Sequence, residues 1–398
     1  MALLQRLLVA LLRVLVAGEH AAGDAMPSPA SGGGGAAVNV EARYARVFCF
    51  GNSLTDTGNN PLLPATAGGP STSPPYGMTF FHRPTGRSSD GRLLIDFIGI
   101  PTPYLAGKTA ADLLAGTNFA VGGATALEPA VLARMGIVSA VPVSLSNETR
   151  WFQDALQLLA SSINARRRIA ETSLFFFGEI GVNDYFLALA SNHTVEQAAA
   201  TLVPDIVGVI RSAVIDAIVA GARTVVVTGM IPLGCEPQLL ALFPAGSAAD
   251  YDPDTGCDAR FNKLAEVHNR ELTRMLRQLR RAFPATTSGN LFADQTSLDR
   301  SSFGDTPLAA CCGGGGNPYN FDFTAFCTLR ASTLCADPSK YVSWDGIHYT
   351  EAVNKFVARS MLRRALIPMP KPNPSLSMPL SSSREHTGQE TSRELATL

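Results

Sequence analysis

The sequence predicts an α/β fold in which helices cover both faces of a parallel sheet. Short runs of consecutive apolar residues alternate along the chain with longer segments of helical periodicity, and this alternation favours a parallel architecture. The apolar runs are continuous rather than mixed with polar residues, which is typical of strands buried on both faces. Ligands of such sheets bind beyond the carboxyl ends of the strands, so the residues after each strand are the first candidates for chemistry.

Apolar runs predict the main strands of this sheet. They cover residues 45–50, 174–178 and 224–231, with a weaker fourth run at 290–294. A further short strand is expected within residues 116–124, where the chain enters a glycine-rich turn at Gly122 and Gly123. The turn is expected to leave backbone N–H groups exposed at the end of that strand.

The helix predicted over residues 195–220 has the clearest boundaries. Thr194 and Gln197 are three positions apart at its start, the spacing of a capping box. Gly221 follows its last turn, and glycine commonly ends a helix at this position.

Three further helices are expected from apolar residues at helical spacing. Two of them cover residues 149–168 and 258–282, and the third begins near Glu351. Thr350 is the candidate N-cap of this last helix, because its hydroxyl can accept a hydrogen bond from the first turn.

Composition and charge describe a globular protein with a large core. Of the 398 residues, 46% are hydrophobic and only 16% are charged. Lys and Arg number 32 against 33 Asp and Glu, and there is no basic cluster large enough to bind nucleic acid. We therefore expect no nucleic-acid partner.

The two ends of the chain are expected to lie outside the folded domain. A basic residue, a short apolar run and small residues predict a secretory signal over residues 1–25. The apolar run falls short of the ~20 residues that span a bilayer, so no integral membrane segment is expected after its removal. Glycine-rich residues 26–42 predict a disordered leader, and Pro- and Ser-rich residues 368–398 a disordered tail. The folded domain is predicted over residues 43–367.

The cysteines and glycosylation motifs favour the same secreted environment. Cys49 lies in an apolar run and is expected to be a buried free thiol, while six cysteines after residue 234 can form three disulfides. None has the paired spacing of a zinc site. Asn147 and Asn192 begin Asn-x-Thr motifs and are candidate glycosylation sites.

Five residues at predicted strand ends or in loops suggest serine chemistry. Ser53 follows the first strand, Gly123 the glycine-rich turn and Asn183 the strand at 174–178, while Asp345 precedes His348 by three positions. Ester hydrolysis by serine needs a nucleophile, a base, a group that orients the base and donors for the oxyanion. Each residue alone also has an ordinary interpretation as a turn, cap or surface position. Their joint occurrence favours a site with Ser53 as nucleophile, His348 as base, Asp345 as its partner, and Gly123, Asn183 and the backbone N–H of Ser53 as donors.

The same segments resemble the sequence blocks of the plant GDSL esterase/lipase family, within the SGNH hydrolases. The matching blocks lie at residues 44–59, 75–92, 118–124, 181–184, 232–235 and 345–348. The resemblance implies a three-layer α/β/α, flavodoxin-like fold whose central parallel sheet has about five strands. It implies the same five site residues and no cofactor or metal. A small-molecule or polysaccharide ester is the expected substrate, and the protein is expected to be a secreted monomer.

Two departures from the family pattern leave an alternative open. Asn52 stands where the family has Asp, and residues 97–101 form a shorter segment than in the family. A catalytically weakened or inactive protein that binds cell-wall glycans is therefore the second hypothesis. The substrate is also open between lipids and small acyl esters such as acetylated sugars or metabolites.

Overall fold

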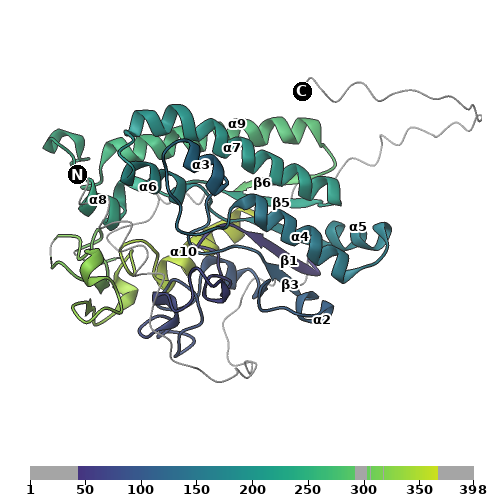
Figure 1. The fold of residues 1–398 in the computed structure, drawn as a ribbon, viewed down its shortest axis with the longest axis horizontal. Coiled ribbons are helices and arrows are strands. Elements are labelled where there is room, and N and C mark those ends of the chain that lie inside the picture. The colour runs from purple at the N-terminus through teal and green to yellow at the C-terminus, as the bar shows by residue number, and fades with distance from the viewer. Residues whose placement is uncertain (1–43, 292–302, 305, 317, 366–398) are drawn as a thin grey trace, which may run out of the picture. The chain divides into compact units, whose positions relative to one another are not determined.

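The computed structural model describes residues 44–291, 303–304, 306–316 and 318–365 of the chain (Figure 1). The predicted signal at 1–25, the leader at 26–42 and the tail at 368–398 lie outside the described residues. Within these ranges, no helix combines the length and apolar character needed to cross a bilayer.

The centre of the fold is a parallel sheet of six strands in the order β2-β3-β1-β4-β5-β6. The expectation of a parallel sheet of about five strands is confirmed, because the sixth strand, β2 at the edge, has only two residues. The strands are β1 (Arg46–Phe50), β2 (Thr102–Pro103), β3 (Gly116–Asn118), β4 (Ser173–Phe177), β5 (Thr224–Thr228) and β6 (Thr287–Leu291).

The last strand begins earlier than the sequence indicated. The apolar pattern predicted it at 290–294, whereas β6 covers Thr287–Leu291 and pairs with β5 along that whole length. Its first residues are Thr, Ser and Gly. Strand β6 lies at the edge of the sheet, and backbone pairing with β5 defines it where apolar character does not.

The register of the sheet brings four strand ends to one edge. Phe50 of β1 lies opposite Phe177 of β4, which in turn pairs with Val227 of β5. On the other side, Cys49 of β1 lies opposite Asn118, the last residue of β3. The chain extends from β1 to β3 on one side and to β4 on the other, and this reversal of strand order is where ligands bind in open α/β sheets.

One layer of helices consists of α4 (Leu145–Leu159), α7 (Val195–Ala220) and α9 (Ala259–Ala282), which pack in succession (Figure 1). The predicted bounds of α7 are confirmed, as are the reciprocal capping bonds of Thr194 and Gln197 and the stop at Gly221, which has a φ of +120°. The predicted stripe of α9 is also confirmed, because its apolar residues are buried.

The single helix predicted over 149–168 is wrong, because the structure has two helices there. Helix α4 ends at Leu159, Ala160 is extended, and α5 (Ile163–Glu171) begins anew with Ser162 as N-cap. The Ser162 side chain accepts a hydrogen bond from the backbone N–H of Ala165 at 3.2 Å. Apolar spacing continues across the break, so periodicity alone does not reveal the cap.

The second layer contains α10 (Glu351–Ala365), which packs against the 3-10 turn Leu94–Phe97 and against β6. Thr350 accepts a hydrogen bond at Oγ1 from the backbone N–H of Val353 at 3.5 Å, as expected of its N-cap. The short 97–101 segment leads directly from the 3-10 turn into β2. All five residues of β4 are buried, which agrees with a sheet covered on both faces.

The remaining elements are short and lie mostly at the carboxyl ends of the strands. They are α2 (Ala110–Leu113), α3 (Pro129–Arg134), α6 (Val182–Ala190), α8 (Pro237–Leu242), β7 (Cys312–Gly313) and β8 (Thr333–Leu334). Three disulfides brace this region: Cys235–Cys257, Cys311–Cys335 and Cys312–Cys327. The three expected disulfides are therefore confirmed, and Cys49 is free and buried as expected.

Candidate active site

Ser53 lies in the loop that follows β1, and a buried carboxylate holds this loop in shape. Asp56 accepts hydrogen bonds at Oδ1 from the backbone N–H groups of Gly58 and Asn59, at 2.7 and 2.6 Å. Its Oδ2 accepts from the N–H of Gly122 at 2.8 Å. One carboxylate therefore joins the serine loop to the glycine-rich turn after β3.

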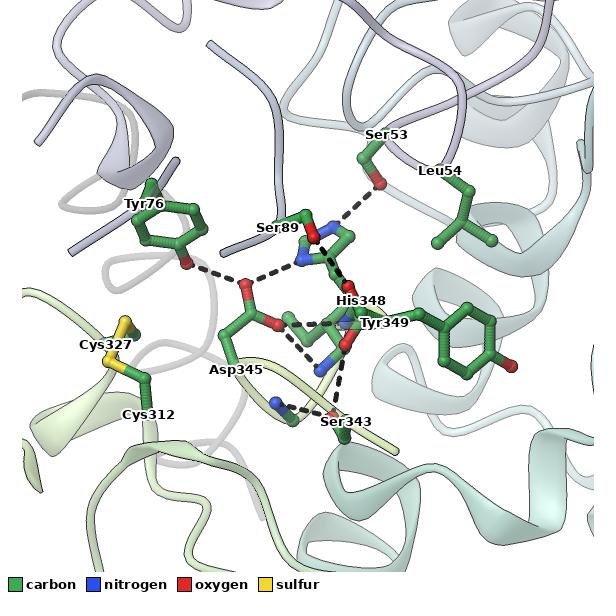
Figure 2. A network of polar contacts seen from close by, with 12 residues as sticks. Ser53, Leu54, Tyr76, Ser89, Cys312, Cys327, Ser343, Asp345, His348 and Tyr349 are labelled. Atoms are coloured by element: carbon green, nitrogen blue, oxygen red, sulfur yellow. Dashed lines mark hydrogen bonds and ion pairs between the residues drawn. A yellow bond between two sulfur atoms is a disulfide. The ribbon is translucent and has the colours of Figure 1, made fainter. Parts of the chain in front are cut away.

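Ser53, His348 and Asp345 form a continuous hydrogen-bonded line (Figure 2). Ser53 Oγ lies 2.9 Å from His348 Nε2, and His348 Nδ1 lies 2.7 Å from Asp345 Oδ2. The side chain of Asp345 is fully buried, and that of His348 is 12% exposed. The imidazole is therefore held between a buried carboxylate and a hydroxyl that faces a cavity.

The loop that carries Asp345 and His348 is closed by its own backbone. Asp345 Oδ1 accepts from the N–H groups of Ile347 and His348 at 3.0 and 2.9 Å. Gly346, between Asp345 and Ile347, has a φ of +93°, and a Cβ at this position would clash with the ring of Phe321. Only glycine fits this turn, and the turn fixes the imidazole relative to the carboxylate.

Tyr76 is a fourth member of the line that sequence reasoning did not assign. Its hydroxyl donates a hydrogen bond to Asp345 Oδ2 at 2.7 Å, and its ring packs edge-on against Trp344. Burial raises the pKa of Asp345, but the charge of His348 and the hydrogen bonds from His348 and Tyr76 outweigh it and hold this pKa below its ordinary value. Asp345 is therefore an ionised partner for the imidazole.

Three donors face the same cavity beside Ser53. The backbone N–H groups of Ser53 and Gly123 have no hydrogen-bond acceptor among the described residues. Gly123 has a φ of +81°, and a Cβ there would approach Val141 to 2.5 Å. Asn183 uses one Nδ2 hydrogen for the carbonyl of Ala124 at 2.8 Å, which leaves the second for a ligand.

Asp184 fixes the distance between two of these donors. It lies one residue after Asn183 and accepts from the N–H groups of Ala126 and Leu127 at 2.8 and 3.0 Å. Burial raises the pKa of Asp184 to about 7 despite these hydrogen bonds. The first turn of α6 is thereby attached to the loop that carries Gly123.

The side chain of Asn52 makes two hydrogen bonds, one within its own loop and one to a buried carboxyl group. Its Oδ1 accepts from the backbone N–H of Leu54 at 3.0 Å, and its Nδ2 donates to Glu179 Oε2 at 2.5 Å. Burial raises the pKa of Glu179 to about 8, against the opposing effect of hydrogen bonds from Asn52 and Val182.

The cavity beside Ser53 has a volume of about 210 Å³ and is mostly apolar. It is lined by Ser53, Gly123, Asn183 and His348 together with side chains such as Phe186, Leu187, Ile231 and Leu239. The structure thus brings together all five residues that the sequence predicted, with Asp345 buried behind His348. Among the described residues, no group of three or more His, Cys, Asp or Glu is arranged to bind a metal ion.

The two candidate glycosylation sites differ in their surroundings. Asn192 is exposed in the turn between α6 and α7, with a φ of +67°. Asn147 is half-buried in the first turn of α4, where its Oδ1 accepts hydrogen bonds from the backbone N–H and the hydroxyl of Ser144, both at 3.0 Å. Both sites remain predictions.

The geometry of this site is that of the serine hydrolases. A hydroxyl, an imidazole and a buried carboxylate lie in line, with free N–H donors beside the hydroxyl, at the carboxyl edge of a parallel sheet.

The chain belongs to the GDSL-like lipase/acylhydrolase family, whose sequence profile matches residues 47–361. It is 41% identical over 333 residues to GDSL esterase/lipase At2g27360 of Arabidopsis thaliana, covering 80% of this chain and 84% of that protein. It is 40% identical over 340 residues to GDSL esterase/lipase At1g28590 of the same plant, covering 80% and 82%. The resemblance inferred from the sequence blocks is therefore confirmed, and the chain is a carboxylic ester hydrolase.

Proposed function

We propose that the protein hydrolyses acyl esters through a covalent acyl-enzyme formed on Ser53. The observation that carries the proposal is the contact of 2.9 Å between Ser53 Oγ and His348 Nε2, with His348 Nδ1 bound to the ionised Asp345 at 2.7 Å. A serine is a weak nucleophile alone and is activated by an adjacent base that a third group orients.

In the first half of the reaction, Ser53 Oγ bonds to the ester carbonyl carbon while His348 Nε2 takes the hydroxyl proton. The carbonyl oxygen becomes an oxyanion, and the N–H groups of Ser53 and Gly123 and the amide of Asn183 stabilise it. The bond to the alcohol oxygen then breaks, and His348 gives its proton to the leaving alcohol. The acyl group remains on Ser53.

In the second half, water repeats these steps in place of the serine. His348 takes a proton from the water as its oxygen bonds to the acyl carbon, and the same donors hold the oxyanion. The bond to Ser53 Oγ breaks, the serine regains its proton from His348, and the acid is released. No cofactor enters this sequence.

Hydrolysis of p-nitrophenyl acetate by purified protein tests the proposal. Replacing Ser53 with Ala is expected to lower kcat at least roughly 1000-fold, because the nucleophile is removed. Equal rates for the two proteins would contradict the assignment. Activity is also expected to fall as the pH is lowered, because a protonated imidazole cannot act as a base, and a profile that stays flat to about pH 4 would exclude His348 as the base.

An organophosphonate probe distinguishes the hydrolase from the alternative, a non-catalytic protein that binds glycans. We expect the probe to label Ser53, because the hydroxyl is hydrogen-bonded to an imidazole. A folded protein that remains unlabelled would favour the binding function. The local hydrogen bond of Asn52 to the Leu54 N–H supports the catalytic proposal, since Asn supplies there the acceptor that the loop requires.

We further propose that the protein acts in the secretory pathway or outside the cell, as a monomer. The three disulfides support the proposed compartment, because such bonds persist in oxidising environments. Expression with the native leader and mass analysis of the secreted protein test it. We expect residues 1–25 to be removed and a glycan at Asn192, whose side chain is exposed in a turn.

A further inference from the structure

Two polar side chains on the cavity wall have no part in the hydrolytic steps. Glu236 and Gln238 belong to the segment that follows β5, and both line the cavity that Ser53 and His348 share. They are only 7% and 8% exposed. Carboxyl and amide groups at such positions contrast with the apolar lining around them.

The hydrogen bonds of these two side chains are incomplete. Tyr349 donates to Glu236 Oε1 at 3.3 Å. The second oxygen of Glu236 and the amide of Gln238 have no hydrogen-bond partner among the described residues. These atoms are nevertheless accessible to solvent. They are open to the cavity. Leaving polar groups unpaired at a mostly buried position costs free energy, which a ligand that supplies partners would recover.

The surroundings of Glu236 favour the neutral acid over the charged carboxylate. Burial raises the pKa of Glu236 well above its ordinary value, the hydrogen bond from Tyr349 lowers it, and the negative charge of Asp345 raises it further. A protonated carboxyl has one O–H donor and a free acceptor, and the amide of Gln238 also has both. The complementary group is a hydroxyl, which donates and accepts as well.

The segment 236–238 is attached to the loop that carries His348. The backbone N–H of Gln238 donates to the carbonyl of Gly346 at 2.9 Å, and Tyr349 contacts Glu236. Because His348 must protonate the departing alcohol oxygen, the alcohol part of the substrate lies on this side of Ser53. The carbonyl oxygen faces the donors at Gly123 and Asn183.

The two side chains are held in place before any ligand binds. The disulfide between Cys235 and Cys257 fixes the residue just before Glu236, and Pro237 opens α8 directly after it. A subsite that is rigid in advance loses little conformational entropy on binding.

We propose that Glu236 and Gln238 form a hydroxyl-binding subsite for the alcohol part of the ester. The preferred substrates are then esters of polyols or sugars that keep free hydroxyl groups. This inference names the substrate class of the hydrolysis proposed at Ser53 and rests on that proposal.

The test compares two acetates that differ only in their hydroxyl groups. Glycerol 1-monoacetate carries two hydroxyls, and 2-methylbutyl acetate carries a methyl group in place of each. We expect the wild type to show a higher kcat/KM for the hydroxylated ester. Glu236→Met and Gln238→Met keep the length of the side chain and remove its hydrogen bonds, so each is expected to lower the ratio of the two kcat/KM values roughly three- to tenfold.

Two further variants separate hydrogen bonding from charge. Glu236→Gln is expected to keep the preference, because a neutral amide still donates and accepts. Glu266→Gln removes an exposed carboxylate of α9 that pairs with Lys263, and as the matched control it is expected to leave the ratio unchanged. A preference for acetylcholine over 3,3-dimethylbutyl acetate that Glu236→Gln removes would overturn the proposal, since it would show a charged, cation-binding carboxylate.

The failures of the two proposals are distinguishable. Absence of p-nitrophenyl acetate hydrolysis by the wild type would contradict the proposed function itself. If the wild type hydrolyses p-nitrophenyl acetate but prefers 2-methylbutyl acetate to glycerol 1-monoacetate, only the subsite proposal is overturned. This comparison requires the wild-type protein alone. An unchanged ratio in folded Glu236→Met and Gln238→Met would overturn it as well.

Discussion

Asn52 donates a hydrogen bond to Glu179 across 2.5 Å, next to the loop that carries Ser53. The other atom of the amide, Oδ1, accepts from the N–H of Leu54, so the orientation of the side chain is determined. Aspartate at this position would keep the acceptor but lose the donor. Two carboxyl groups in contact cannot both ionise without strong repulsion, whereas the amide allows Glu179 to be buried beside it.

Replacing Asn52 with Asp is therefore expected to change kcat/KM by less than about tenfold near pH 6. The Leu54 contact survives the change, and the new carboxyl shares a proton with Glu179. Hydrolysis of p-nitrophenyl acetate measures the effect. A gain of more than roughly 100-fold would show that a charge at this position tunes the site, and would favour the hypothesis of a weakened enzyme.

The raised pKa of Glu179 predicts how stability depends on pH. The folded protein holds the proton up to about pH 8, whereas an ordinary Glu loses it near 4.5. The folded state then binds more protons, so this contribution to stability is fully present below pH 4.5 and is lost as the pH rises to about 8. Asp184 acts in the same direction up to about pH 7.

Glu179→Gln removes this titration, so the free energy of unfolding is expected to decline less steeply as the pH rises. The slope that it removes is at most about 1.4 kcal/mol per pH unit between the two pKa values. Urea unfolding at several pH values between about 5 and 8 measures it. Parallel curves for the wild type and the variant would contradict a protonated Glu179.

Tyr76→Phe tests the contact with Asp345 through a pH profile. Without the hydroxyl, the Asp345 carboxylate loses a donor and attracts the protonated imidazole of His348 more strongly. The acid limb of kcat/KM is therefore expected to move to higher pH by up to about one unit. The ring still packs against Trp344, so folding is expected to be preserved. A lower kcat with an unmoved acid limb would indicate a purely structural role for Tyr76.

Asn183→Ala is expected to lower kcat roughly 100- to 1000-fold, as loss of one oxyanion donor does. The loss should appear in kcat rather than in KM, because the oxyanion forms only in the transition state. Asn192→Ala, at an exposed turn on the other end of α6, is the control and should retain kcat. A loss confined to KM would show that Asn183 binds the ground state.

The sequence predicted the central sheet and the five principal residues because both depend on local signals. Continuous apolar runs identified the buried strands β1, β4 and β5, and polar residues after strand ends identified the candidate site. The break between α4 and α5 was missed because apolar spacing continues through Ala160. The start of β6 was missed because pairing with β5, a non-local interaction, defines it.

The supporting residues of the site could not be predicted for the same reason. Tyr76 and Asp345 are 269 positions apart, and no pattern within either segment shows that they meet. Glu236 and Gln238 follow the matched block at 232–235, but only the folded structure shows that they line the same cavity as Ser53. Burial also raises the pKa of Glu236, and burial is a property of the whole fold.

The 295 positions between Ser53 and His348 have a consequence for the life of the protein. During synthesis the chain emerges from its amino end, so the serine loop and all six strands of the parallel sheet are made before His348 is. An unfinished or carboxyl-truncated chain that ends before residue 348 holds a serine without its base. Hydrolytic capacity thus arrives only with the segment that carries Asp345 and His348, directly before α10 ends the described chain at Ala365.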